Sequence, residues 1–343
     1  MKGLEYKQFQ NETKCVGVAF GTNITLPLLF GNGIKSLITT SAKYVKACVK
    51  PDKASDWGKS ATIKATRSLI PCVQEAFDDG IRIFDCSRAY GGSEQRLAKA
   101  LRAVPREQVF LITKINDASQ FMGRVEACFE ESLRQLKTDY VDLLLLHWPV
   151  DYPDIGKECK DAFQHTVPVY ARSWHVLEQI YKSGKARAIG VANFSIAQME
   201  KLKTYAEIMP MANEFECHPL CIRAELNQYC QEHGIQVFAY AALCAMDDRL
   251  KNNAMSEIAE KHKKSIAQVI LKWHIQRGRI PIFGTTKVNR IREYSVLDFS
   301  LTDDELDRID AQNINYRAFP DSEHCDFTKG IWLGWESYKD CCP

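Results

Sequence analysis

The feature that most limits the possible folds is an alternation of short apolar segments with amphipathic segments, repeated eight times. The apolar segments have the length and composition of buried strands, and the amphipathic segments have helical spacing. The expected strands are 15–20, 82–86, 109–114, 141–147, 187–194, 211–216, 236–243 and 279–285. The expected helices are 68–79, 93–103, about 120–137, about 170–183, from 196, from about 222, about 254–277 and from about 287. Eight consecutive β/α units predict an α/β fold of the closed parallel (β/α)8 type, a TIM barrel, rather than an open sheet.

Three segments depart from this repeat. Residues 5–20 are expected to form an N-terminal β-hairpin whose second strand opens the barrel, and about 24–66 form an insertion that fits no regular pattern. A C-terminal tail, about 313–343, has no periodicity and is expected to lie over the active-site face. We expect the whole chain, residues 1–343, to fold as one barrel domain.

Composition and charge exclude several classes of function. The chain is 45% apolar and 26% charged, its formal net charge is +2, and it contains no run of like charges. Such a sequence has no electrostatic footprint for nucleic acid or membrane, and no apolar run approaches the length of a membrane span. The 13 cysteines are odd in number, show no CxxC spacing and follow no expected signal peptide, so we expect reduced thiols in a cytoplasmic protein without a metal site.

Four polar residues stand at or just past the C-terminal ends of three successive expected strands, where barrel enzymes place their active sites: Asp85, Tyr90, Lys114 and His147. Each alone could be structural. Together they predict carbonyl reduction, because a carbonyl that accepts a hydride needs a proton and nearby donors. Tyr90 would give the proton, with its pKa lowered by the charge of Lys114. Asp85 would balance Lys114, and His147 would donate to the substrate oxygen or share the proton.

Six segments in the same order resemble motifs of the aldo-keto reductase family. They are DCSRAYGGSE at 85–94, FLITKI at 110–115, LLLLHWP at 143–149, GVANF at 190–194, NEFECHP at 213–219 and AYAAL at 239–243. The resemblance covers almost the whole chain. It implies a (β/α)8 barrel, a nicotinamide cofactor that is NADP(H) or alternatively NAD(H), and reduction of a small-molecule aldehyde or ketone.

The resemblance also assigns the site residues by position. Tyr90 is the acid, supported by Asp85, Lys114 and His147, while Asn193 binds the nicotinamide carboxamide and Tyr240 stacks on its ring. The residues expected to bind the cofactor are Gly21, Thr22, Asn23, Asp85, Asn193, Glu214, Tyr240, Leu243, Thr285, Lys287 and Arg290. The residues expected to line the substrate pocket are Trp148, Tyr90 and His147.

Two departures from the family pattern fall on the carboxamide site. Ala192 replaces the usual serine, and Glu214 replaces the usual glutamine. An ionised Glu214 can accept a hydrogen bond from the carboxamide nitrogen but cannot donate one to its oxygen. We therefore expect looser nicotinamide binding or a different cofactor preference, and we expect the change Glu214→Gln to tighten binding.

A third departure lies where the last strand meets the last helix of the repeat. Gly284 replaces a common lysine, whereas Thr285, Lys287 and Arg290 remain available to the adenosine 2′-phosphate at a helix N-terminus. We expect NADPH to be preferred over NADH, although these residues could also be solvated charges at the start of a helix.

The insertion and the tail leave several roles open. The insertion leaves from the C-terminal end of the first strand, so it could cover the cofactor, shape the substrate pocket, form an interaction surface or act as a lid. The aromatic residues of the tail could line the substrate pocket or pack on the barrel. They are Tyr316, Phe319, Phe327, Trp332 and Trp335.

Two other functions remain possible for the same sequence. One is a regulatory barrel that binds the cofactor with little or no turnover, like the reductase-related β subunits of potassium channels. The other is a lyase or isomerase that uses Lys114 as a Schiff base, but a lysine paired with Asp85 should stay protonated and be a poor nucleophile. The sequence leaves the natural substrate, the direction of the reaction and the oligomeric state open.

Overall fold

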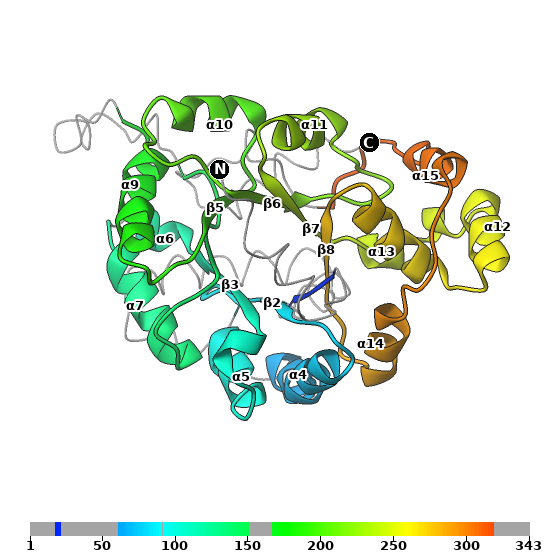
Figure 1. Ribbon diagram of the computed structural model, residues 1–343, viewed down its shortest axis with the longest axis horizontal. Helices are drawn as coiled ribbons and strands as arrows, with labels where there is room; N and C mark the ends of the chain where they lie inside the picture. The colour runs from blue at the N-terminus through cyan, green and yellow to red at the C-terminus, as the bar shows by residue number, and fades with distance from the viewer. Residues whose placement is uncertain (1–17, 22–60, 91, 122, 151–166, 319–343) are drawn as a thin grey trace.

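Eight parallel strands close into a barrel in the order of the sequence (Figure 1). The structure, a computed structural model, describes residues 18–21, 61–90, 92–121, 123–150 and 167–318. The strands are β1 (Ala19–Gly21), β2 (Ile83–Asp85), β3 (Phe110–Ile115), β4 (Leu143–Leu146), β5 (Ile189–Ala192), β6 (Ala212–Glu216), β7 (Gln236–Tyr240) and β8 (Ile280–Phe283). Each strand pairs in parallel with the next, and β1 also pairs with β8, which confirms the expected (β/α)8 barrel.

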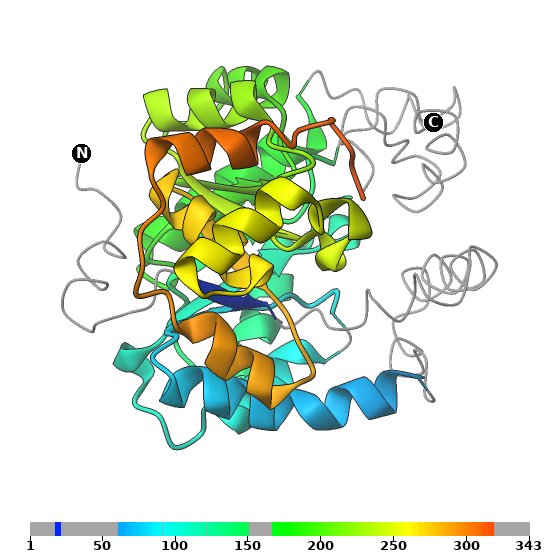
Figure 2. The ribbon, with the colours of Figure 1, turned by 90° about the vertical axis from the view of Figure 1, so that its right-hand side faces the viewer.

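Helices surround the barrel (Figure 1). They are α4 (Ala61–Asp78), α5 (Ser93–Ala100), α6 (Asp117–Phe121), α7 (Val125–Leu136), α9 (Val169–Lys182), α10 (Ile196–Lys203), α11 (Ala224–Glu232), α12 (Asn253–His262), α13 (Ile266–Gln276), α14 (Val288–Ser295) and α15 (Asp303–Asp310). The first and the last helices of the repeat, α4 and α14, lie side by side (Figure 2) and are joined by an ion pair between Glu75 and Arg292.

Three helices differ from the expectation. Helix α4 begins at Ala61, so the last part of the expected insertion, 61–66, is helical. The helix expected at about 120–137 is divided into α6 and α7, because Gly123 between them adopts a left-handed φ of 64°. Helix α15 has no counterpart among the expected elements, although Thr302 and Glu305 form a capping box at its start.

Parts of the sequence predictions lie outside the described residues. They are the hairpin up to residue 17, the insertion from 24 to 60 and the tail from 319 onward. Of the tail aromatics, Tyr316 is described, and its ring packs against the guanidinium of Arg249 at 3.7 Å from the ring centroid. It therefore packs on the barrel, in agreement with one of the two expected roles.

Alternate strand residues fill the inside of the barrel. This interior cluster is apolar and includes Ile83, Ile112, Leu145, Ala212 and Phe238. Because side chains alternate along a strand, the next inward position along each of these strands lies two residues further toward its C-terminal end. There the residue type changes to a charged or polar one. The inward column continues with Asp85, Lys114, His147, Glu214 and Tyr240.

Gly190 occupies the inward position of β5. A Cβ atom at this position would lie 2.6 Å from the carbonyl oxygen of Ala212 and 2.8 Å from a methyl carbon of Leu145. The inside of the barrel therefore has no room for a larger residue at this level.

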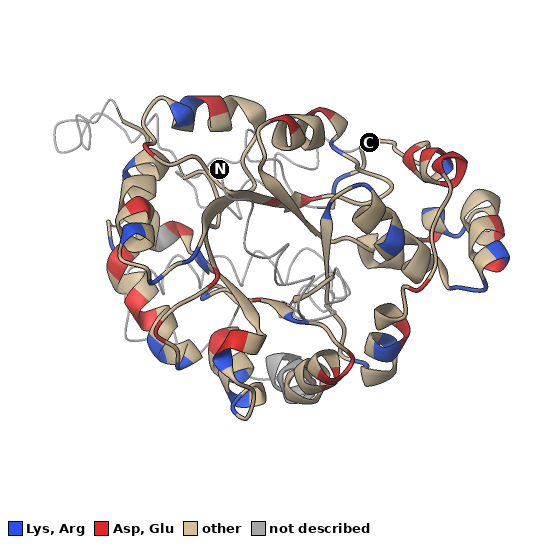
Figure 3. Ribbon diagram, viewed as in Figure 1, with Lys and Arg blue, Asp and Glu red and all other residues tan. Residues whose placement is uncertain are grey.

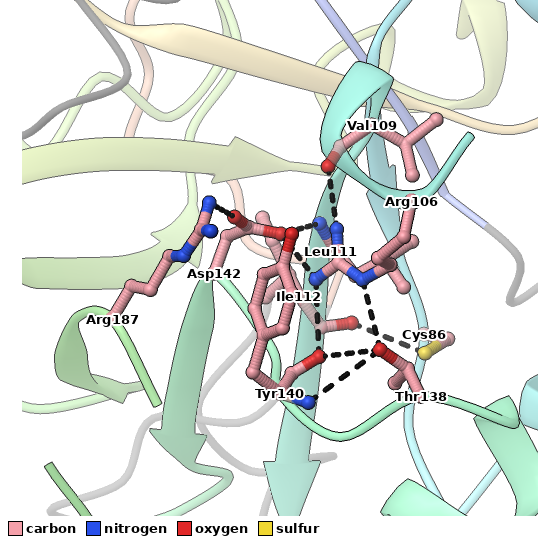
Figure 4. Close-up of polar contacts among 9 residues, drawn as sticks. All are labelled: Cys86, Arg106, Val109, Leu111, Ile112, Thr138, Tyr140, Asp142 and Arg187. Carbon is pink, nitrogen blue, oxygen red and sulfur yellow. Dashed lines mark hydrogen bonds and ion pairs between the residues drawn. The ribbon is translucent and has the colours of Figure 1, made fainter. Parts of the chain in front are cut away.

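The opposite end of the barrel is held by a buried carboxylate, Asp142 (Figure 4). It accepts hydrogen bonds from Arg106 Nη2 at 2.6 Å, from the backbone N–H of Leu111 at 2.9 Å and from Arg187 Nη1 at 3.3 Å. Both guanidinium groups also lie over the ring of Tyr140, at 4.0 and 3.9 Å from its centroid. Asp142 thus joins the N-terminal ends of β3, β4 and β5.

The outer surface carries charges of both signs, and the described cysteines lie inside the protein. Acidic and basic residues are interspersed over the outer helices (Figure 3). In the described part of the chain, no helix is long and apolar enough to span a membrane. The cysteines recorded there as free are all buried, which confirms their expected use as small hydrophobic residues: Cys72, Cys86, Cys128, Cys217, Cys221, Cys230 and Cys244.

We expect Asp142→Asn to lower the free energy of unfolding by about 2–3 kcal/mol, because two guanidinium groups lose the negative charge that they share and one of the two acceptor oxygens becomes an NH2 donor. Urea unfolding measures this change. The control is Asp139→Asn, an exposed carboxylate three residues earlier, which should unfold near the wild-type midpoint. Equal midpoints for the two variants would show that Asp142 does not hold this end of the barrel.

Candidate active site

A fully buried lysine lies at the centre of the polar end of the barrel. Lys114, on β3, donates hydrogen bonds to Asp85 Oδ1 on β2 and to the carbonyl oxygen of Cys86 at 3.3 Å. Its Nζ also lies 3.3 Å from Glu214 Oε1, which comes from β6. The three side chains reach one another because each occupies an inward position at or near the C-terminal end of its strand. Lys114 therefore has two carboxylates around one positive charge.

Burial and the neighbouring charges shift the pKa values of Lys114, Asp85 and Glu214. Burial by itself lowers the pKa of Lys114, but Asp85 and Glu214 outweigh it and raise that pKa well above its usual value. Burial raises the pKa of Asp85 against the attraction of Lys114. Burial and then the charge of Asp85 raise the pKa of Glu214 to about 8. Because Lys114 keeps its proton, it is a poor nucleophile, which disfavours the Schiff-base alternative.

Tyr90 lies between this lysine and the end of β4. Its hydroxyl is 3.4 Å from His147 Nε2, and Lys114 Nζ lies 5.1 Å from the centroid of its ring. Burial raises the pKa of Tyr90, and the charge of Lys114 offsets only part of that effect. The prediction that Lys114 lowers the pKa below that of a free tyrosine is therefore wrong for this structure, because desolvation of the phenolate is the larger effect.

His147 is neutral in this setting. Burial, assisted by the charge of Lys114, lowers its pKa to about 3. A neutral imidazole carries one N–H donor and one acceptor, so it can exchange a hydrogen bond with the hydroxyl of Tyr90. The structure thus brings Asp85, Tyr90, Lys114 and His147 together, as their positions at the strand ends predict.

Asn193 ties three strand ends together. Its Nδ2 donates to the carbonyl oxygen of His147 at 3.0 Å, and its Oδ1 accepts from the hydroxyl of Tyr240 at 2.8 Å. Its backbone N–H donates to the carbonyl oxygen of Glu214 at 2.8 Å. The residue has a left-handed φ of 64°, a conformation that asparagine adopts more readily than most residues. Asn193 therefore fixes the positions of the neighbours with which it was expected to bind the nicotinamide.

The remaining predicted residues lie around the same end. Gly21 ends β1, while Thr22 and Asn23 lie outside the described residues. Trp148 is half-buried beside His147, and Gln120 Nε2 donates to its carbonyl oxygen at 3.1 Å. Leu243 is half-buried in the segment that follows β7 and packs against the core.

The predicted phosphate-binding residues lie at the start of α14. Thr285 is buried, and its hydroxyl oxygen accepts from the backbone N–H of Lys287 at 3.1 Å. The side chains of Lys287 and Arg290 are exposed. The first turn of α14 contains no acidic residue, and no side chain caps its N-terminus. The backbone N–H groups of this helix end and two cations are therefore open to an anion.

A second buried carboxylate, Glu216, was missed by the sequence analysis. It accepts from the backbone N–H of Ala318 at 2.6 Å, lies within hydrogen-bond distance of His218 Nε2 at 3.0 Å and forms an ion pair with Arg317 at 3.5 Å. It thus connects the end of β6 to the segment that leads into the tail. The signal was present, because Glu216 stands two residues after Glu214 and so on the same side of the strand.

No group of three or more His, Cys, Asp or Glu side chains that could hold a metal ion occurs among the described residues.

Comparisons with known proteins agree with this geometry. Residues 55–314 match the model of the Aldo/keto reductase family. The uncharacterized oxidoreductase YtbE of Bacillus subtilis is 40% identical over 266 residues, which are 76% of this chain and 89% of that protein. Glyoxal reductase of the same organism is 38% identical over 258 residues, 74% of this chain and 87% of that protein. The crystal structure of a Bombyx mori aldo-keto reductase in complex with NADP has a TM-score of 0.71 at 26% identity, and covers 92% of this chain and 94% of its own.

We expect Lys114→Met to lower the free energy of unfolding at pH 8 by about 3 kcal/mol or more, since two buried carboxylates lose the cation that they share. The pKa values of Asp85 and Glu214, already raised, would rise further. The folded state would then hold protons that the unfolded chain releases above about pH 4.5, so stability should fall as the pH rises.

Melting temperatures at pH 5 and pH 8 measure this effect. The control is Lys182→Met, which removes a lysine that pairs with Glu207 on the surface and should leave both melting temperatures near the wild-type values. A Lys114→Met protein that melts like the wild type at both values of pH would contradict the charge balance described above.

Proposed function

Because this chain belongs to the aldo/keto reductase family, we propose that Tyr90 gives the proton when the protein reduces an aldehyde or ketone to an alcohol. The protein is an oxidoreductase with NADP(H) as its cofactor. The observation that carries the proposal is the convergence of Tyr90, Lys114, Asp85 and His147 at one end of the barrel.

A bound nicotinamide would supply the hydride that the carbonyl carbon accepts, and the residues of the chain act on the carbonyl oxygen. The oxygen becomes an alkoxide, which is a stronger base than a phenolate, and it takes the proton of the Tyr90 hydroxyl. The positive charge of Lys114, 5.1 Å from the ring centroid, stabilises the phenolate that remains. His147 donates to the same oxygen from its neutral imidazole and orients the hydroxyl of Tyr90.

The raised pKa of Tyr90 is compatible with this role. It keeps the proton on the hydroxyl until negative charge develops on the substrate oxygen. Asp85 contributes through Lys114, whose side chain it holds in place and whose charge it balances. Asp85 is thus a positioning residue in this proposal, while Tyr90 and His147 contact the substrate.

The residues around this end fit a nicotinamide nucleotide. Asn193, Glu214 and Tyr240 would hold the nicotinamide, and a buried oxygen of Glu214 without a hydrogen-bond partner among the described residues is available to it. At the other end of the nucleotide, Thr285 and the two exposed cations at the start of α14 would bind the 2′-phosphate. Because NADPH carries this phosphate and NADH does not, these residues support a preference for NADPH.

The substrate side of the site is aromatic. Trp148 is half-buried just after β4 and directly follows His147, whose Nε2 lies 3.4 Å from the hydroxyl of Tyr90. An aromatic wall beside the proton donor favours a carbonyl compound with an apolar or aromatic substituent. Trp148, Tyr90 and His147 form the substrate pocket in this proposal.

We expect Tyr90→Phe to lower kcat for a reactive aromatic aldehyde by about 10²- to 10⁴-fold, because the proton donor is lost. Binding of NADPH, measured by fluorescence titration, should stay within about threefold of the wild type. The control is Tyr205→Phe, an exposed tyrosine on the outside of the barrel, which should turn over normally. Full activity of Tyr90→Phe would exclude Tyr90 as the acid.

We expect the double change Lys287→Met and Arg290→Met to weaken NADPH binding by about tenfold to a hundredfold, with NADH binding unchanged, because NADH lacks the 2′-phosphate. Titration with both nucleotides measures the difference. Arg292→Met is the control on the same helix, since Arg292 is held by Glu75 of α4. An equal loss of affinity for NADPH and NADH would place the phosphate site elsewhere.

A further inference from the structure

Two buried carboxylates share one buried cation at this site. Asp85 accepts a hydrogen bond from Lys114, whereas Glu214 lies at the longer distance of 3.3 Å from the same nitrogen. One positive charge can balance one carboxylate in an environment from which water is excluded. The shorter contact assigns that charge to Asp85, so Glu214 lacks a full counter-charge of its own.

The second oxygen of Glu214 has no hydrogen-bond partner among the described residues. Glu214 is only 2% exposed, and its Oε2 is buried. A buried carboxylate oxygen without a donor is costly, because nothing replaces the water that it has lost. Protonation removes the charge and converts this oxygen from an acceptor without a partner into a donor.

Apart from Lys114, which attracts the carboxylate, the groups that face Glu214 also favour its neutral form. They come from four different parts of the barrel: Asp85 on β2, Lys114 on β3, Tyr90 in the loop after β2, and Tyr240 on β7. Lys114 is the only cation among them, and burial keeps both tyrosines protonated. In agreement with this arrangement, burial and then the charge of Asp85 raise the pKa of Glu214 to about 8.

We propose that Glu214 acts as a neutral carboxylic acid whose Oε2–H donates a hydrogen bond to the carboxamide oxygen of the bound nicotinamide. The inference rests on the proposed function, in which Glu214 belongs to the nicotinamide site. A neutral acid has one donor and one acceptor side, as a glutamine amide has, so it can do the work of the glutamine usual at this position. Unlike an amide, the acid loses its donor when the pH rises.

This inference revises the expectation drawn from the sequence. An ionised Glu214 predicts that Glu214→Gln tightens cofactor binding at every pH. A neutral Glu214 predicts that the substitution has little effect near pH 7 and tightens binding only above about pH 8, where the acid ionises.

The first experiment is fluorescence titration with NADPH between pH 6 and pH 9.5, on the wild type and on Glu214→Gln. If the acid form binds and its pKa is about 8, the wild-type Kd rises about tenfold between pH 7 and pH 9, since the protonated fraction falls by that factor. The Kd of Glu214→Gln does not show this tenfold rise between pH 7 and pH 9. A wild-type Kd that does not change, or that changes in parallel with that of the variant, overturns the proposal.

Asp85→Asn distinguishes the proposed role of Glu214 from a purely structural one, which would not change the pH dependence of NADPH binding. Without Asp85, Lys114 can serve Glu214 alone and stabilises its carboxylate, so the pH at which binding weakens moves to a lower value. An unchanged midpoint in Asp85→Asn would contradict the competition of the two carboxylates for Lys114.

The protein without nucleotide provides a readout that does not depend on cofactor binding. A carboxyl whose pKa is raised from 4.5 to about 8 on folding contributes stability below about pH 4.5, and this contribution is lost as the pH rises to about 8. The melting temperature of Glu214→Gln should therefore rise relative to the wild type between pH 5 and pH 8. The control is Glu225→Gln, an exposed carboxylate on α11, which should melt in parallel with the wild type.

These readouts separate the inference from the proposed function. If neither the wild type nor Glu214→Gln binds NADPH at any pH, the proposed function fails. Diverging melting profiles would then still support a neutral Glu214, and parallel profiles would overturn it.

Discussion

The balance of charge around Lys114 is the constraint on which the rest of the site depends. The lysine is fully buried, so its positive charge requires a carboxylate in contact, and Asp85 supplies it from the neighbouring strand. Burial, assisted by the same charge, keeps His147 neutral, and the charge lies close enough to Tyr90 to stabilise a phenolate there. A second carboxylate, Glu214, exceeds what one lysine can balance, and this excess gives the site a group that can titrate.

The closed barrel makes this cluster possible because the contacts that stabilise the fold and the buried charges of the site lie in different parts of it. At one end, Asp142 binds two arginines and a backbone N–H and so fixes three strands to one another. Between the ends, the inside of the barrel is apolar and tightly packed, as the close approach at Gly190 shows. The other end can then hold buried charges, because the stability of the barrel is supplied elsewhere.

Much of the fold and of the site could be predicted from local sequence. The strands were expected within a few residues of their observed positions, and Asp85, Lys114 and His147 were expected together because parallel strands bring their C-terminal ends to one face. The division of a helix at Gly123 and the helix α15 were missed, since a single glycine and a short capped segment are weak signals in a long amphipathic pattern. The pKa of Tyr90 was wrong in direction, because burial is not visible from the neighbouring residues of the sequence.

The sequence by itself determined the number and order of the β/α units, and with them the end of the barrel at which its polar residues gather. It also determined which residue types stand there. Inward positions recur every second residue along a strand, and the inward positions that follow the apolar interior are Asp85, Lys114 and Glu214. Only the tertiary structure decided how these groups share charge. Lys114 and Glu214 lie on strands that are not neighbours, and their contact exists because the sheet closes on itself. The raised pKa of Glu214 follows from the exclusion of water and from the charge of Asp85, against the attraction of Lys114. These effects depend on the whole barrel rather than on any one segment.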